Sequence, residues 1–205
     1  FSPDGSKIAF QSMERDGDES DLDRLFVYDM KDGKRTWVSK GWDFDVENIT
    51  WANDQTIYFT CAYLGTGQIF KTNTSDCGVD KVTEGIHDIG PINLKSGVLV
   101  AGLVSMSMAP EVSVIDMTTG QVKQISFINK AVYESIKMGK VEERYIKTKD
   151  HKDLQMWIIY PPDFEPSKKY PALLFCNGGP QTPIGQFWSY RWNFQMMAAK
   201  GYIVI

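Results

Sequence analysis

Histidine and cysteine are scarce in this 205-residue chain. The three cysteines, Cys61, Cys77 and Cys176, have no C-x-x-C spacing, and Cys61 and Cys176 fall in apolar runs that are typical of buried positions. Neither of the two histidines, His87 and His151, forms a ligand cluster with a cysteine. The sequence therefore predicts no structural zinc site, no other metal site and no cofactor.

Strong charge of one sign and long apolar runs are also missing. The net charge is -4, and lysine and arginine do not cluster, so the sequence does not predict a nucleic-acid partner. No stretch approaches the roughly 18 consecutive apolar residues of a membrane-spanning helix. A composition with 42% hydrophobic and 13% aromatic residues is typical of a globular protein with buried cores.

A pattern of short strands and Gly/Asp turns recurs roughly every 42 to 50 residues. The expected strands are 7–11 and 24–28 in the first unit, 56–60 and 68–71 in the second, and 98–101 and 111–115 in the third. One such unit cannot bury both of its faces alone, so neighbouring units must stack, which favours β-propeller blades over a sandwich. Three units are too few for the usual ring of about 4 to 8 blades, so we expect part of a propeller.

The repeat pattern ends before residue 140. Residues 130–137 predict one or two helical turns, and we place a domain boundary there, after residue 135. Residues 141–148 and 154–160 then predict a hairpin whose turn contains His151. His87 lies in a loop between two repeats, where we expect its ring to bond to backbone rather than to act in catalysis.

The apolar run 172–176 ends at Asn177 and Gly178, with Gly179, Pro180 and Gln181 following. Such a run predicts a strand buried on both faces that stops at a sharp turn. The carboxyl ends of strands hold the chemistry of open α/β sheets, and glycine there lets backbone N–H groups approach a bound oxygen. A tight turn without a function remains the alternative.

The order of several segments resembles the start of the α/β-hydrolase domain in the prolyl oligopeptidase family of serine peptidases. These segments are 160–164 (YPPDF), 168–171 (KKYP), 177–181 (NGGPQ) and 201–205 (GYIVI). Residues 186–195 further resemble bacterial dipeptidyl peptidases of that family, and the opening Phe-Ser-Pro-Asp-Gly turn resembles the family's propeller repeat.

The resemblance implies a mainly β fold with two parts. Residues 1–135 would be the C-terminal blades of a β-propeller, and residues 136–205 would be the start of an α/β-hydrolase domain. That domain carries its nucleophile in a Gly-x-Ser-x-Gly elbow, with the acid and the histidine later in the chain. No such elbow occurs in this sequence. The chain is therefore expected to be a fragment whose catalytic triad lies beyond Ile205.

The resemblance also implies a function for the longer parent protein. It would be a serine exopeptidase that hydrolyses short peptides through an acyl-enzyme, with peptides as its partners and a homodimer left open. A periplasmic or otherwise exported location is implied by the bacterial relatives alone, and a cytoplasmic one stays open. The alternatives are a β-propeller binding module and an inactive hydrolase-like scaffold.

Asn177 departs from the family pattern. In much of the family the residue before the glycine pair is a tyrosine whose hydroxyl helps to hold the oxyanion. Asparagine can donate through its side-chain amide, so Asn177 and Gly178 are the oxyanion-hole candidates. The donor could be this amide or a backbone N–H near Gly178, and an asparagine that only stabilises the turn remains the alternative.

Acidic side chains gather between residues 14 and 23. Their spacing matches a calcium loop only in part, because an EF-hand needs glycine at its sixth position and glutamate at its twelfth, and this sequence has Asp21 and Val27. A solvated loop between two strands is favoured over a calcium site. The resemblance implies that such loops can also contact the positive amino terminus of a peptide.

Overall fold

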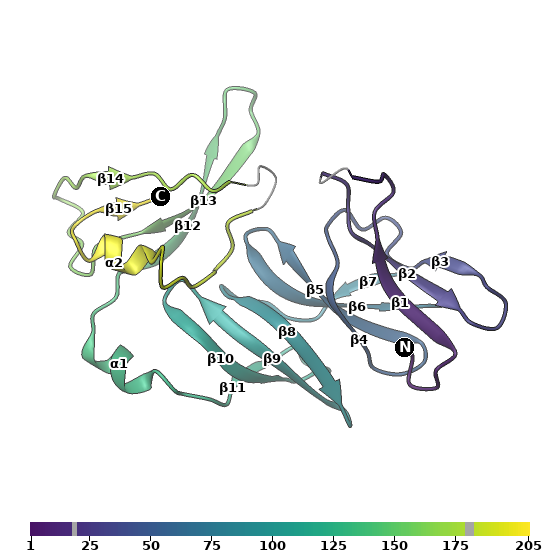
Figure 1. Ribbon diagram of the computed structural model, residues 1–205. Helices are drawn as coiled ribbons and strands as arrows, with labels where there is room; N and C mark the ends of the chain where they lie inside the picture. Colours follow the sequence, from purple (N-terminus) through teal and green to yellow (C-terminus); the bar gives the residue numbers. More distant parts are fainter. Residues whose placement is uncertain (18–19, 179–182) are drawn as a thin grey trace.

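The computed structural model describes residues 1–17, 20–178 and 183–205, and strands make up most of its regular structure (Figure 1). The first three strands form an antiparallel sheet, which we term the first meander. Its strands are β1 (Lys7–Ser12), β2 (Arg24–Asp29) and β3 (Arg35–Trp37). The strands expected at 7–11 and 24–28 are thus confirmed.

The next eight strands form one sheet that consists of two four-stranded antiparallel meanders. The second meander contains β4 (Glu47–Trp51), β5 (Thr56–Tyr63), β6 (Thr66–Asn73) and β7 (Val79–Lys81). The third contains β8 (Asp88–Lys95), β9 (Val98–Ser105), β10 (Met108–Ile115) and β11 (Val122–Gln124). In the described part of the chain, these two meanders are joined by one parallel pairing, Gly67 with Asp88.

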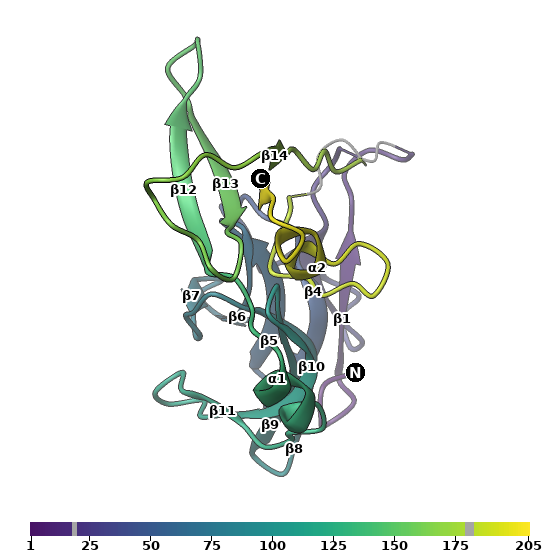
Figure 2. The ribbon, with the colours of Figure 1, turned by 90° about the vertical axis from the view of Figure 1, so that its left-hand side faces the viewer.

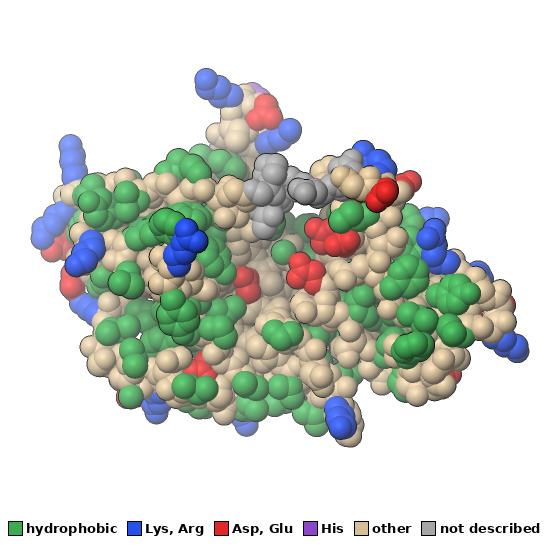
Figure 3. Space-filling model, viewed as in Figure 1, with side chains coloured by type: hydrophobic (Ala, Val, Ile, Leu, Met, Phe, Trp, Pro, Cys, Tyr) green, Lys and Arg blue, Asp and Glu red, His purple; other side chains and the backbone are tan. Residues whose placement is uncertain are grey.

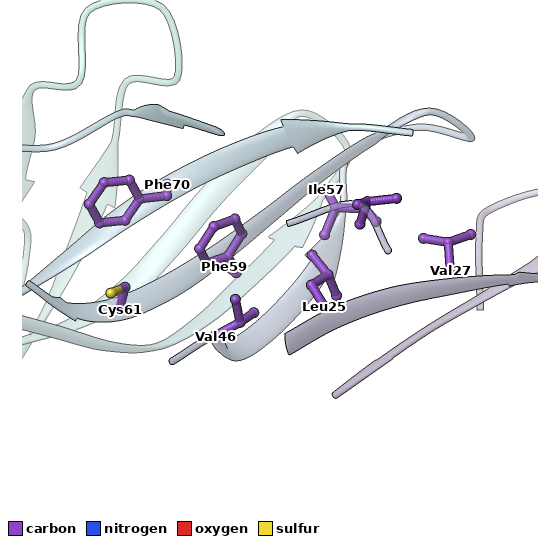
Figure 4. Close-up of a cluster of buried hydrophobic side chains, with 8 residues drawn as sticks. Leu25, Val27, Val46, Ile57, Phe59, Cys61 and Phe70 are labelled. Atoms are coloured by element: carbon purple, nitrogen blue, oxygen red, sulfur yellow. The ribbon is translucent and has the colours of Figure 1, made fainter. Parts of the chain in front are cut away.

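The meanders pack face to face because their strands alternate apolar side chains between two faces. On β5, Ile57 and Phe59 belong to the core between the first and second meanders, whereas Tyr58 belongs to the core between the second and third. Figure 4 shows the first of these cores, in which Leu25 from β2 lies near Ile57. The second meander is therefore buried on both faces.

The recurring turn predicted from the sequence has the same chemistry in two meanders. Gly33 donates its backbone N–H to the carbonyl of Asp29 at 3.0 Å, and Gly120 donates to Asp116 at 2.8 Å. The Asp29 and Asp116 carboxylates accept backbone N–H groups inside the turn. Both glycines have positive φ, +72° and +74°, which a residue with a side chain rarely adopts.

The last part of the chain forms a four-stranded sheet in the order β12-β13-β15-β14. Its strands are β12 (Val141–Lys147), β13 (Asp153–Ile159), β14 (Ala172–Leu173) and β15 (Ile203–Val204). The hairpin of β12 and β13 is as predicted, with His151 in its turn at a φ of +64°. In both Figure 1 and Figure 2 this hairpin projects from the molecule.

Two short helices accompany this sheet. α1 (Lys130–Ser135) confirms the predicted helical turns, and the Tyr133 hydroxyl accepts the backbone N–H of Ala109 on β10 at 2.7 Å. α2 (Phe194–Ala198) starts at Asn193, whose side chain accepts the Met196 N–H. Neither helix of the described chain is long and apolar enough to cross a membrane.

The sequence predicted a strand buried on both faces over residues 172–176, and the structure differs from this prediction. β14 comprises two exposed residues, the Leu174 side chain is 73% exposed and Cys176 is exposed, so burial on both faces was wrong. β14 lies at the edge of the sheet and pairs with β15 alone, and α2 packs on β13 and β15 instead. An apolar run is buried on both faces only where packed elements cover both, and the described chain supplies none over β14.

Candidate functional site

A cleft of about 320 Å³ lies between the second meander and the residues that follow β14. Glu47 and Cys61 line it from the second meander, Asp88 from the start of β8, and Asn177 and Gly185 from the opposite side. Figure 3 shows acidic side chains gathered around the hollow between the two halves of the molecule. The cleft thus combines carboxylates with an amide that can donate a hydrogen bond.

Negative charge is concentrated beside this cleft. The pKa of Glu47 is raised, first by burial and then by the neighbouring carboxylates of Asp45 and Asp23. The pKa of Asp23 is raised for the same two reasons, burial and Asp45. The Asp45 carboxylate is held in place by the Asp23 backbone N–H at 2.8 Å. The neighbouring carboxylates of Glu47, Asp45 and Asp23 together favour the approach of a cation.

Cys61 is part of the cleft wall and is buried, as the sequence predicted. Burial raises the pKa of its thiol to about 12, and the charges of Asp45 and Glu47 act in the same direction. At neutral pH the thiol is protonated and does not act as a nucleophile.

We expect Cys61 to resist iodoacetamide at pH 8 in the folded full-length protein, because alkylation requires an accessible thiolate. Mass spectrometry of the tryptic peptide that contains Cys61 measures this. The same peptide should be labelled fully after unfolding in guanidinium. Labelling of the folded protein at the rate of a free thiol would contradict the prediction.

Asn177 borders the cleft from the end of β14. The chain leading to it is fixed by the Phe175 N–H, which donates to the Ile205 carbonyl at 2.7 Å. Asn177 and its neighbour Gly178 are both exposed, and a Cβ atom added to Gly178 would meet no atom within 4 Å. Residues 179–181 of the predicted motif lie outside the described residues.

Asp88 was not singled out by the sequence. Its carboxylate accepts the backbone N–H of Gly67 at 2.6 Å and that of Gln186. Burial raises its pKa, and these two hydrogen bonds act against the shift. A usable sequence signal was its position at the first residue of a strand, directly after the connection 82–87.

His87 lies between β7 and β8, as expected. The hydrogen bond to backbone that we expected for its ring is not formed by the Nε2 atom. The Nε2 atom is buried and has no hydrogen-bond partner among the described residues. Burial also lowers the pKa of the ring, which keeps it neutral at neutral pH.

The acidic loop turns one of its carboxylates inward. Asp21 accepts the backbone N–H groups of Glu14 and Arg15 at 2.6 and 2.7 Å and pairs with Arg24. These contacts, the Arg15 N–H foremost, lower the pKa of Asp21 to about 2. Asp18 and Glu19 of the predicted run lie outside the described residues. In the rest of the described chain, no group of three or more His, Cys, Asp and Glu side chains could hold a metal ion.

A larger cavity, of about 770 Å³, borders the β12–β13 hairpin. Its charged side chains satisfy one another, since Glu142 pairs with both Lys140 and Arg144 at 2.7 Å.

No family model matches the chain. Dipeptidyl-peptidase 5 of Porphyromonas gingivalis is 40% identical over 206 residues, which cover 100% of this chain and 30% of that protein. Dipeptidyl-peptidase 5 of Porphyromonas endodontalis is 38% identical over the same shares. The chain is thus similar throughout its length to dipeptidyl-peptidase 5 proteins. It spans about 30% of the length of these relatives.

Solved structures of other peptidases share the fold. Acylaminoacyl peptidase of Pyrococcus horikoshii superposes with a TM-score of 0.80 at 23% identity, over 98% of this chain and 30% of that one. Dipeptidyl peptidase 4 of Porphyromonas gingivalis superposes with a TM-score of 0.68 at 20% identity, over 97% and 28%. The three meanders and the sheet that follows therefore adopt an arrangement found in peptidases of known structure.

Proposed function

We propose that the full-length protein is a serine exopeptidase that releases short peptides, most simply dipeptides, from the amino terminus of its substrate. The observation that carries the proposal is the cleft in which Asn177 lies opposite Glu47 and its neighbouring carboxylates. The similarity to dipeptidyl-peptidase 5 proteins supports it.

The reaction would proceed through an acyl-enzyme. A serine hydroxyl attacks the scissile carbonyl carbon and gives its proton to a histidine, and the carbonyl oxygen becomes an oxyanion. The amine leaves with that proton, and water then hydrolyses the ester. Residues 1–205 contain no Gly-x-Ser-x-Gly elbow, so the serine, acid and histidine would come from another part of the full-length protein.

The architecture would be the end of a β-propeller followed by the start of an α/β-hydrolase domain. The three meanders stack like blades, and two of them have four antiparallel strands each. The Tyr133 hydroxyl of α1 accepts a hydrogen bond from β10 of the third meander, which supports a boundary at residue 135, immediately after the helix. The parallel pairing of β14 with β15 supports an α/β sheet in residues 136–205.

Asn177 would help to hold the oxyanion. Its side chain is exposed at the cleft and carries an amide NH₂ that can donate to a developing negative charge. The neighbouring Gly178 has open space where a side chain would lie, and its backbone N–H is the second candidate donor. Both residues follow the strand β14, which fixes their approach to the cleft.

The carboxylates would select a free amino terminus. A protonated amine carries the one positive charge common to all peptide amino termini, and Glu47 with Asp45 and Asp23 offers it a negative region. An endopeptidase has no such requirement, which is why the charge distribution favours an exopeptidase.

Replacing Glu47 by glutamine should raise KM for dipeptidyl substrates by about 10-fold and change kcat little, because the lost charge binds a distant part of the substrate. Steady-state kinetics with substrates that carry a free or an acetylated amino terminus measure this. KM for the acetylated substrate should be the same in the wild type and in Glu47→Gln. In the wild type, KM should rise as pH falls through the raised pKa of Glu47, since protonation removes the charge. An unchanged KM would exclude Glu47 from amine binding.

The proposed function is tested with the full-length protein, a fluorophosphonate probe directed at reactive serines, and a panel of dipeptidyl chromogenic substrates. Serine labelling together with release of the dipeptide supports it. Absence of both would exclude the enzyme and favour a propeller binding module or an inactive hydrolase-like scaffold.

A further inference from the structure

The geometry points to Asp88 as a positioning residue that fixes the cleft wall of residues 183–187 against the second and third meanders. The inference rests on the proposed function in one respect. It assumes that this wall keeps the oxyanion donors correctly positioned relative to the other side of the cleft.

On the meander side, Asp88 sits where the second and third meanders meet. It pairs with Gly67 across the parallel bridge, and its carboxylate accepts the Gly67 N–H at 2.6 Å. A Cβ atom on Gly67 would lie 3.0 Å from the Asp88 Cα and the Ile89 nitrogen, so the strands approach too closely for most side chains. The position of the Asp88 carboxylate is therefore determined by the sheet.

On the other side, the same carboxylate holds the cleft wall. It accepts the backbone N–H of Gln186. A Cβ atom on Gly185 would lie 2.6 Å from Oδ2 of Asp88, so this segment also requires glycine to reach the carboxylate. The Gln186 side chain is buried, and its Oε1 accepts the Met106 N–H of the third meander at 3.4 Å. Residues 185 and 186 are thus attached to the meanders at two points.

These contacts distinguish the role of Asp88 from that of Glu47, the other carboxylate that lines the cleft. Its oxygens accept backbone N–H groups from two distant segments, whereas no side-chain hydrogen bond or ion pair of Glu47 is found in the described chain. Burial of the Asp88 carboxylate makes those bonds stronger than they would be in water. Asp88 therefore acts through the wall, and Glu47 is the carboxylate that faces the substrate.

The wall matters because it carries one side of the cleft. Gly185 and Pro183 line the same cleft as Asn177. Catalytic groups and substrate must keep their geometry closely, and a displacement of about 1 Å can cost about 100-fold in rate. Loosening the attachment of residues 185 and 186 is expected to lower kcat without removing any group that touches the substrate.

The test is Asp88→Asn in the full-length protein. Asparagine has nearly the same shape but one acceptor oxygen, and its NH₂ faces a backbone N–H donor. We expect kcat for a dipeptidyl substrate to fall by about 10-fold with KM changed less than about 2-fold. Glu47→Gln is the matched control, since it should show the opposite pattern, a raised KM with kcat nearly unchanged. An unchanged kcat in Asp88→Asn, or a change in KM alone, would overturn the inference.

A double-mutant cycle with Gly185→Ala links the effect to the contact itself. The added methyl group collides with the Asp88 carboxylate in the wild type, and the collision is absent when residue 88 is alanine. Gly185→Ala should therefore lower kcat by about 10-fold in the wild type and by less than about 2-fold in Asp88→Ala. Equal effects in the two backgrounds would contradict a direct coupling.

Amide hydrogen exchange separates this inference from the proposed function. In Asp88→Asn the Gly67 and Gln186 amides should exchange at least about 10-fold faster than in the wild type, with the Ile57 and Phe59 amides as unaffected references. If the wild type shows no turnover, the proposed function fails, and amide exchange alone tests the role of Asp88. Faster exchange at Gly67 and Gln186 in Asp88→Asn would support Asp88 as the residue that attaches the wall. Unchanged exchange at both amides would contradict it.

Discussion

Replacing Asn177 by alanine is expected to lower kcat of the full-length protein in the proposed reaction by about 100- to 1,000-fold, or about 2.7 to 4 kcal/mol of transition-state stabilisation. The reason is that the side-chain amide borders the cleft and would donate to the oxyanion, a charge that exists only in the transition state. KM should change little, because the neutral carbonyl of the bound substrate gains much less from the same donor. Steady-state kinetics with a dipeptidyl chromogenic substrate measure both constants.

Two controls make this result specific. Asn177→Asp keeps the shape of the side chain but replaces the donor by a negative charge, so it should be at least as inactive as Asn177→Ala. Fluorophosphonate labelling of both variants reports whether the reactive serine is still in place. If Asn177→Ala keeps full kcat, the side chain is not the donor, and the backbone N–H near Gly178 takes its place as the candidate.

The strands of the three meanders could be predicted where the sequence alternates or carries β-branched and aromatic residues. β5 and β10 are examples, and both extend beyond the expected ranges. β4, β8 and the short strands were missed. β7 (Val79–Lys81) and β11 (Val122–Gln124) each have three residues, too few for an alternation to be visible, and they exist because β6 and β10 offer them a partner.

The error at β14 has a different origin. An apolar run predicts burial only through the elements that pack on it, and those elements are distant in sequence. The run at 172–176 pairs with β15 at one edge, and its outer side is uncovered in the described residues. The residue that ends the run, Asn177, lines a cleft in the structure, and its role as an oxyanion donor stays a prediction.

The carboxylates of the cleft could not be predicted, because their proximity is a property of the tertiary fold. Glu47 and Asp88 are 41 positions apart in the sequence and belong to two different meanders. Sequence reasoning instead weighed the run at residues 14–23, where six acids are close in the chain. In the structure one of these, Asp21, binds its own loop, whereas Asp23 is the member that lies near Glu47.

The second large effect concerns stability. Phe59→Ala is expected to lower the free energy of unfolding by about 3 to 5 kcal/mol, because Phe59 is fully buried between the first and second meanders. Its ring stacks on Phe70 at 5.9 Å, so truncation also leaves a cavity beside a second aromatic ring. The guanidinium midpoint of the full-length protein, followed by circular dichroism, measures the loss.

Controls for Phe59→Ala separate burial from mere loss of an aromatic ring. Phe127 is 58% exposed, and Phe127→Ala should shift the free energy of unfolding by less than about 0.5 kcal/mol.

The two large predictions also differ in kind. Asn177→Ala should leave the midpoint unchanged because its side chain is exposed, while Phe59→Ala should retain kcat well below its midpoint because Phe59 does not line the cleft. A loss of kcat in folded Phe59→Ala would mean that packing between the first two meanders controls the geometry of the cleft.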